Sequence, residues 1–366
     1  MTSRPIFELT IGHLNVRLGE RTLIIGALNV TPDSFSDGGL YLDPARAVEH
    51  GLELVREGAD WIDVGGESTR PGSRPVSAEE ELRRVLPVIK GLRRKLRSTL
   101  ISIDTTKAEV AEQAVQAGAS ILNDVSGLRF DPRLAEVARR YKIPLILMHL
   151  RGRPETMQTR PFVKDIMQSL HRGLARSVQR ALAAGLRRSQ LILDPGLGFG
   201  KSRFQNFEIL ARLSQLRRFG LPILVGTSRK SFVQAIAAGG GFHAAARHSP
   251  RSRRGAAAFW PMMEKLKAQV GGRHGPPPCL LESYGRQAEG FGPQGGVPQL
   301  QLGDAAAVVA SILAGAHIVR VHDVAAVLPA VRIADAVLAA SGSGQVVRWA
   351  DRQVGSRVEL AIGSKK

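Results

Sequence analysis

Eight short apolar runs with β-forming residues recur along this chain, and they constrain its fold more than any other feature. They span residues 23–28, 61–64, 100–103, 121–122, 145–148, 191–193, 223–225 and 318–321. Charged stretches with apolar residues at helical spacing separate them, as at residues 45–57, 78–96, 108–117 and 165–184. This alternation is typical of βα units around a parallel sheet, and eight strands close a barrel. We therefore predict an α/β protein with a (βα)8 TIM-barrel fold.

The remaining segments are assigned around this barrel. Residues 1–22 alternate apolar and polar side chains, which predicts a hairpin that closes the barrel floor. Residues 23–237 hold strands one to seven, and residues 303–345 hold the strand-eight unit and the last helix, followed by a tail at 346–366. Residues 238–302 form a long insertion between strands seven and eight, and its mixture of Gly, Pro and Arg predicts disorder. One short helix, at residues 259–270, is the alternative within it.

Composition excludes several classes of protein. Cys279 is the only cysteine, so this chain alone forms neither a disulfide nor a multi-thiolate metal site. No apolar run reaches the roughly 18 residues of a membrane helix, and the first residues lack a signal-peptide pattern, so we expect no membrane contact and a cytoplasmic protein. The formal net charge of +19 would attract nucleic acid, but the Arg residues are scattered and lack interleaved aromatic residues. We expect no nucleic-acid partner.

Polar residues follow nearly every predicted strand at its C-terminal end, where barrel enzymes place their reactive groups. In chain order these are Asn29, Asp63, Asp104, Asn123 with Asp124, His149, Asp194, residues 228–230 and residues 320–322. A helix cap is the simpler explanation for any single one, and we accept it for Asp33, Asp43 and Ser77. It is weaker for Asp104, Asn123 and Asp194, because each directly ends an apolar run.

These residue types point to a flat heterocycle bound beside an anion. A carboxylate accepts paired N–H bonds, and an amide supplies both a donor and an acceptor, so Asp104, Asn123 and Asp194 beside Lys230 suit a nitrogen heterocycle. The cationic or neutral donors for phosphate oxygens are Arg70, Arg229, Arg320 and His322, although Arg229 fits a solvated surface equally well.

Two other motifs are rejected. GLGFGKS lacks the first Gly of a P-loop, because Pro195 stands in its place. His149 has no second His or Cys at ligand spacing, so we interpret it as a histidine of the pocket wall.

Eight motifs in order resemble the dihydropteroate synthase family. They are NVTPDSFSDGG, DVGGESTRPGS, IDTTK, NDVSG, MHLRGRPETMQ, DPGLGFGKS, GTSRKSF and RVHDV, within residues 22–236 and 303–340. The resemblance implies a barrel enzyme, a transferase of folate biosynthesis that joins 6-hydroxymethyl-7,8-dihydropterin diphosphate to para-aminobenzoate. The products are 7,8-dihydropteroate and diphosphate, and sulfonamides would compete for the aminobenzoate pocket.

Residue roles follow from the same resemblance. Asp104, Asn123, Asp194 and Lys230 would bind the pterin, with Met148 and Phe199 in the substrate site, and Asn29 would contact Mg²⁺ on the diphosphate. Arg320 and His322 would hold the phosphate oxygens. Thr69, Arg70 and Ser231 would help form the aminobenzoate site, beside Pro71 and the loop residue Phe35. We assign catalysis to Asp104, Lys230, Arg320 and His322.

The chain departs from the family between residues 232 and 303, where the family has a short helix and an R-L-x-G-[ST] element. That helix often belongs to the family's dimer contact, so homodimer formation is left open. Two alternatives remain: a pterin-binding methyltransferase barrel, which needs no diphosphate or aminobenzoate site, and a catalytically impaired basic paralogue that binds nucleic acid or acts as a scaffold.

Overall fold

The computed structural model describes residues 4–11, 14–31, 43–69, 72–159, 161–237 and 299–341. The expectations for Asp33, Phe35, Arg70, Pro71, the tail and most of the insertion, including the helix at 259–270, lie outside these ranges. The helix that follows the insertion begins at Gln299, within the range expected to belong to the insertion.

Eight parallel strands form the barrel. They are β3 (Leu23–Asn29), β4 (Trp61–Gly65), β5 (Leu100–Asp104), β6 (Ile121–Asp124), β7 (Leu145–Met148), β8 (Leu191–Asp194), β9 (Leu224–Gly226) and β10 (Ile318–Val321). Their order in the sheet is β8-β7-β6-β5-β4-β3-β10-β9. A single parallel bridge between Leu193 and Ile223 joins the two ends of this order and closes the barrel. The predicted fold is therefore confirmed.

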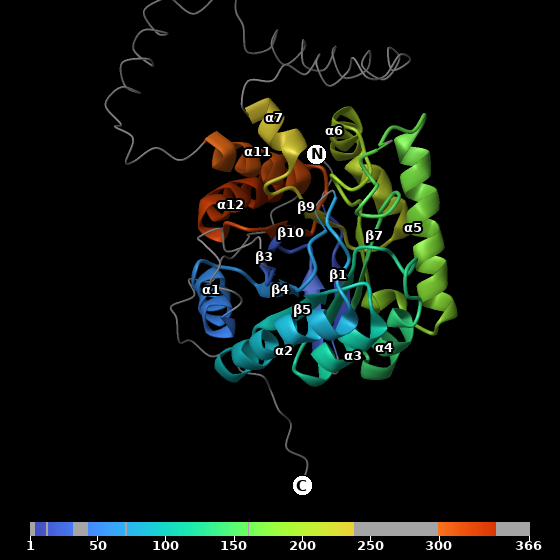
Figure 1. Ribbon diagram of the computed structural model, residues 1–366. Helices are drawn as coiled ribbons and strands as arrows, with labels where there is room; N and C mark the ends of the chain where they lie inside the picture. The colour runs from blue at the N-terminus through green and yellow to red at the C-terminus, as the bar shows by residue number, and fades with distance from the viewer. Residues whose placement is uncertain are drawn as a thin grey trace, which may run out of the picture.

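The helices surround these strands, and the last ones lie beside the first (Figure 1). They are α1 (Pro44–Arg56), α2 (Ala78–Lys95), α3 (Ala108–Gln116), α4 (Leu134–Tyr141), α5 (Ile166–Ala183), α6 (Arg203–Ala211), α7 (Ser231–Ala237), α11 (Gln299–Leu313) and α12 (Val324–Ser341), with 3₁₀ turns η2 (Arg188–Gln190) and η3 (Leu213–Phe219). Several of these helices begin with a capping side chain that accepts a backbone N–H of the first turn. The capping residues are Asp43, Ser77, Asp165 and Ser202. The cap expected for Asp43 and Ser77 is thus present.

A β-hairpin lies under the barrel. Strands β1 (Phe7–Ile11) and β2 (Leu14–Leu18) pair in antiparallel register. Leu9, Ile11 and Leu18 are buried in one cluster with inward-pointing residues from seven barrel strands: Ile25, Trp61, Ile121, Ile146, Ile192, Leu224 and Ile318. The hairpin and these residues make an apolar floor.

The same register places polar residues directly above this floor. Side chains two residues apart in a strand point to the same side, so the residue two positions after each floor residue also points into the barrel. Those positions hold Ala27, Asp63, Asn123, Met148, Asp194, Gly226 and Arg320. The barrel interior therefore changes from an apolar floor to a mostly polar mouth within one layer of side chains.

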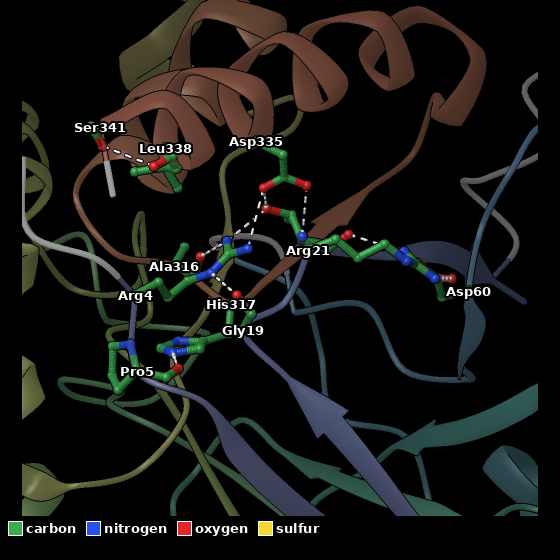
Figure 2. Close-up of polar contacts among 11 residues, drawn as sticks. Arg4, Pro5, Gly19, Arg21, Asp60, Ala316, His317, Asp335, Leu338 and Ser341 are labelled. Atoms are coloured by element: carbon green, nitrogen blue, oxygen red, sulfur yellow. Dashed lines mark hydrogen bonds and ion pairs between the residues drawn. The ribbon is translucent and has the colours of Figure 1, made fainter. Parts of the chain in front are cut away.

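A buried ion pair joins Arg4, near the N-terminus, to helix α12 (Figure 2). The Asp335 carboxylate of α12 accepts the Thr22 backbone N–H at 2.7 Å, the Thr22 hydroxyl at 2.7 Å and the Arg4 guanidinium at 3.2 Å. Arg4 also donates to the carbonyls of Gly19 and Ala316. Every charge in this cluster is therefore paired or hydrogen-bonded, which a buried charge requires.

His317, as a neutral imidazole, hydrogen-bonds the same N-terminal segment at Pro5. Burial lowers its pKa to about 3. Its Nδ1 lies 3.1 Å from the Ile223 backbone N–H and accepts from it, so Nε2 carries the proton and donates to the Pro5 carbonyl, also at 3.1 Å.

Among the described helices, α12 is the one that is long and apolar enough to cross a membrane by length and composition. Core helices pass the same test. This helix packs beside α11 in the outer ring, with Val324, Val327 and Val331 buried (Figure 1).

Replacing Asp335 by Ala should lower the free energy of unfolding by about 3 to 5 kcal/mol, because Arg4 would remain buried without its partner. Denaturant unfolding measures this change. The matched control is Glu208→Ala, which breaks the partly exposed pair with Arg212 and should cost below about 1 kcal/mol. Equal losses in the two variants would contradict the role given to the buried pair.

Candidate functional site

A cavity of about 1020 Å³ opens at the carboxyl ends of the strands. Every described residue of the predicted site lines it: Asn29, Thr69, Asp104, Asn123, Met148, Asp194, Phe199, Lys230, Ser231, Arg320 and His322. These residues are separated by up to nearly three hundred positions in sequence, and the barrel brings them to one mouth.

Asp104 and Arg320 line the cavity, and the buried carboxylate of Asp63 lies behind them. Arg320 on β10 donates from Nε to Asp63 at 2.6 Å, and its Nη2 lies 3.5 Å from Asp104. Asn123 on β6 donates from Nδ2 to Asp63 at 3.0 Å. Asn123 gives one of its two N–H groups to Asp63, which orients the amide and leaves its carbonyl oxygen and its second N–H for a ligand.

Burial shifts the titration of the groups around this centre. It raises the pKa of Asp104 to about 8, with the negative charges of Asp63, Glu81 and Asp124 adding to the rise and Arg320 opposing it. It likewise raises the pKa of Asp194 to about 6, against the backbone N–H of Gly196, which donates to this carboxylate at 2.6 Å. Carboxyl groups with raised pKa values inside a cavity are typical of functional sites.

Lys230 faces the same carboxylates from the loop after β9. Burial and the neighbouring positive charge of Arg320 together lower its pKa to about 8. Its ammonium nitrogen lies 4.2 Å from the centre of the Phe199 ring, within the range of a cation–π contact. Lys230 and Phe199 together form one wall of the cavity.

A chain of hydrogen bonds fixes the other side. Ser228 donates to the Asp304 carboxylate at 3.0 Å, so its oxygen accepts from Nδ1 of His322 at 3.3 Å. In the neutral ring His322 Nε2 then accepts from Asn29 Nδ2 at 3.2 Å, whereas in the protonated ring Nε2 is a donor for a phosphate oxygen. The Asn29 amide is thereby oriented with Oδ1 as its remaining polar atom, which is an oxygen ligand of the kind that Mg²⁺ prefers.

The turn between β8 and α6 is built on Lys201. This buried lysine donates to the carbonyls of His149 at 2.9 Å, Gly196 at 2.7 Å and Phe199 at 3.0 Å. Burial lowers its pKa to about 7. Gly196, Gly198 and Gly200 all have positive φ, which turns the backbone so that these carbonyls converge. The turn places Asp194 and Phe199 on the cavity wall.

Comparisons with known proteins show which family this chain belongs to. A family model described as "pterin binding enzyme" matches residues 25–260, more than half of the chain. The dihydropteroate synthase of Synechocystis is 47% identical over 228 residues, covering 62% of this chain and 78% of that protein. The chain belongs to the dihydropteroate synthase family.

Two solved structures extend the likeness beyond the insertion. The Xanthomonas albilineans dihydropteroate synthase with 4-aminobenzoic acid superposes with a TM-score of 0.70 at 35% identity, covering 92% of this chain and 99% of that one. The same enzyme in complex with 7,8-dihydropteroate gives a TM-score of 0.67 at 33% identity, covering 91% and 99%. The family predicted from the eight motifs is confirmed.

The structure thus places the predicted residues together, while their individual roles stay predictions. Arg70 lies outside the described residues. Arg229 lines the cavity with its backbone in the left-handed region, at φ 58°. Its backbone N–H donates to both oxygens of Asp304.

Sequence reasoning gave no role to three buried residues that build this site. Asp63 was noted only as a strand-end residue, and its partners lie on distant strands. Lys201 lies in the GLGFGKS motif that is rejected as a P-loop, and its position after alternating glycines is the sequence signal for its role in the turn. Asp304 follows the insertion in LQLGD, where the family pattern is lost, so no motif indicated that it meets Ser228.

Gly196→Ala should destabilise the protein by more than about 2 kcal/mol, because its Cβ would lie 2.3 Å from the His149 carbonyl oxygen. Gly72→Ala is the matched control. Gly72 also has positive φ, at 82°, but nothing lies within 4 Å of its Cβ, so the cost should be about 1 kcal/mol. Thermal and denaturant unfolding measure the stability of both variants. Equal losses of stability would contradict the proposed clash between the Gly196 position and the His149 carbonyl.

Proposed function

We propose that this chain catalyses the dihydropteroate synthase reaction, joining 6-hydroxymethyl-7,8-dihydropterin diphosphate and para-aminobenzoate into 7,8-dihydropteroate with release of diphosphate. One observation carries the proposal. Asp104, Asn123, Asp194 and Lys230 line the same cavity as Asn29, Arg320 and His322, so a heterocycle site adjoins a phosphate site. The relatives named above carry this activity in their names.

The pterin is assigned to the deep end of the cavity. Its ring carries N–H donors and nitrogen or oxygen acceptors along its edges. The carboxylates of Asp104 and Asp194 accept such donors, as does the free carbonyl oxygen of Asn123, and Lys230 donates to ring acceptors. Met148 is buried at the cavity surface in a small apolar cluster with Val125, Leu150 and Met157, with Phe199 packed against it. This apolar surface suits the flat face of the ring.

The diphosphate is assigned to Arg320, His322 and Asn29. Arg320 contacts Asp63 through Nε and Asp104 through Nη2, and these contacts orient the guanidinium. Its Nη1 donors make neither contact, so we assign them to the phosphate oxygens. Among the described residues no group of three or more His, Cys, Asp or Glu could hold a metal ion. The site nonetheless fits Mg²⁺ bound through the substrate, because this ion keeps its waters and is usually shared between one or two protein oxygens and phosphates. Asn29 Oδ1 supplies that oxygen, and Mg²⁺ would neutralise charge on the diphosphate.

The aminobenzoate is assigned to the outer part of the cavity, beside Ser231 and Thr69. Thr69 stands in the loop after β4, whose base is fixed by the ion pair between Glu67 and Lys107. Lys107 also pairs with the buried Glu81 at 2.5 Å. The family resemblance assigns Arg70, which follows Thr69 in the sequence, to the same aminobenzoate site, where it would help to exclude water.

The chemistry follows from the charges. The bond between the pterin methylene carbon and the diphosphate oxygen breaks, and its electron pair leaves with diphosphate. The resulting cation is stabilised by ionised Asp104, while Arg320 and His322 stabilise the departing anion. The aromatic amine nitrogen then bonds to the methylene carbon and loses a proton. Since Asp104 acts as its carboxylate, activity should rise with pH through the pKa of this group.

The cytoplasmic location, the dependence on Mg²⁺ and the homodimer are proposals of the same kind. The methyltransferase alternative lacks support, because a methyl transfer uses neither a diphosphate site nor the GESTRPGS and GTSRKSF loops. The basic-paralogue alternative is tested by the assay that follows.

The protein incubated with pterin diphosphate, Mg²⁺ and labelled para-aminobenzoate should form labelled dihydropteroate, and a sulfonamide should suppress it. Asp104→Ala should lower the rate by about 100-fold or more, since it removes the charge that stabilises the cation. Chromatography of the labelled product measures both. A wild-type rate no higher than that of a folded Asp104→Ala protein would overturn the proposed function.

Asn123→Ala should weaken binding of the pterin diphosphate by about 10-fold, because a hydrogen bond to the ring is lost and Asp63 loses one donor. Titration calorimetry measures this affinity. Ser120→Ala, near the opposite end of β6, is the control and should leave the affinity unchanged. If Asn123→Ala binds the pterin diphosphate with the wild-type affinity, the assignment of the Asn123 amide to the pterin site is wrong.

A further inference from the structure

Asp63 is a fully buried carboxylate next to the cavity, and it does not line the cavity itself. It points inward from β4, one layer above the apolar floor. Three neighbouring donors from three other strands converge on it: the Ser102 hydroxyl on β5, the Asn123 amide on β6 and the Arg320 guanidinium on β10. Asn123 and Arg320 share its Oδ2, and Ser102 donates to Oδ1.

A carboxylate is the group that these three donors require. Ionised Asp accepts hydrogen bonds at both oxygens, whereas Asn has one acceptor oxygen and presents N–H groups at the other position. Asn in place of Asp63 therefore leaves one of the two oxygen positions without an acceptor, and it also removes the charge that strengthens the hydrogen bond from Arg320. Buried donors that lose an acceptor reorient or attract water. The two that line the cavity, Asn123 and Arg320, would then move within the site.

We propose that Asp63 is a positioning residue for the reaction: it sets the Asn123 amide with its oxygen toward the pterin and holds the Arg320 guanidinium at the diphosphate. This inference rests on the proposed function. Asp63 touches no substrate and acts through its two neighbours. The negative charge of Asp63 also makes ionisation of Asp104 less favourable. The charges of Glu81 and Asp124 act in the same direction, and the positive charges of Arg320 and Lys230 act in the opposite direction.

The chain offers a matched control for the loss of a buried charge. Asp335 is also buried, is paired with an arginine and accepts from Thr22 as well, but it lies on α12 and does not line the cavity (Figure 2). Asp63→Asn and Asp335→Asn are thus the same chemical change at two buried carboxylates, of which only Asp63 contacts residues that line the cavity. Both should lower the melting temperature, and only the first should affect the site.

The experiment compares the wild-type protein, Asp63→Asn and Asp335→Asn in steady-state kinetics, calorimetry and pH profiles. Asp63→Asn should lower kcat/KM for the pterin diphosphate by about 100-fold and its affinity by about 10-fold, with the KM for para-aminobenzoate nearly unchanged. The acid limb of its pH profile should move to lower pH, because loss of the Asp63 charge lowers the pKa of Asp104. Asp335→Asn should keep the wild-type affinity and pH profile.

The outcomes separate the two proposals. A wild-type protein that forms no dihydropteroate refutes the proposed function. An active wild-type protein refutes the positioning role if Asp63→Asn stays within about twofold of it in kcat/KM and affinity, or if Asp335→Asn loses affinity equally. Should Asp63→Asn not fold, Ser102→Ala keeps the charge and removes one donor. It should then weaken pterin diphosphate binding by about fivefold, and unchanged affinity would refute the role.

Discussion

The structure depends on one geometric constraint, the two-residue period of side chains inside the barrel. The residues that start each strand are large and apolar and pack on the hairpin as a floor. Two positions later the same strands present Asp63, Asn123, Asp194 and Arg320. A slip of one residue in any strand would bury these groups among the outer helices. The apolar floor therefore holds the register on which the polar mouth depends.

This arrangement gathers buried charges that would be costly alone. Asp63, Arg320 and Asp104 form one connected set, in which each charge lies within 4.0 Å of an opposite charge. A buried ion pair of this kind adds little net stability, because desolvation offsets the attraction. The pair instead orients the site, since Asp63 holds Arg320 and Asn123 in place before any ligand binds. Preorganised donors and acceptors are also what a site needs to stabilise developing charge.

Much of this was predictable from the sequence. The eight apolar runs marked the strands within a few residues, and the residues after them marked Asn29, Asp104, Asn123 and Asp194, because parallel strands in a barrel end at one face. Supporting residues were harder to predict. The contacts of Asp63 with Ser102 and Arg320, and of Asp304 with Ser228, join elements distant in sequence. Only the closed barrel brings these partners together.

A crystal structure of the wild-type protein with the pterin diphosphate bound tests the central claim most directly. The account predicts density for the ring between Asp104, Asn123 and Asp194, with the Asn123 oxygen toward the ring. The diphosphate should then lie against Arg320, His322 and Asn29. Density for the ligand elsewhere on the protein, or an unchanged empty mouth at saturating ligand, would contradict it.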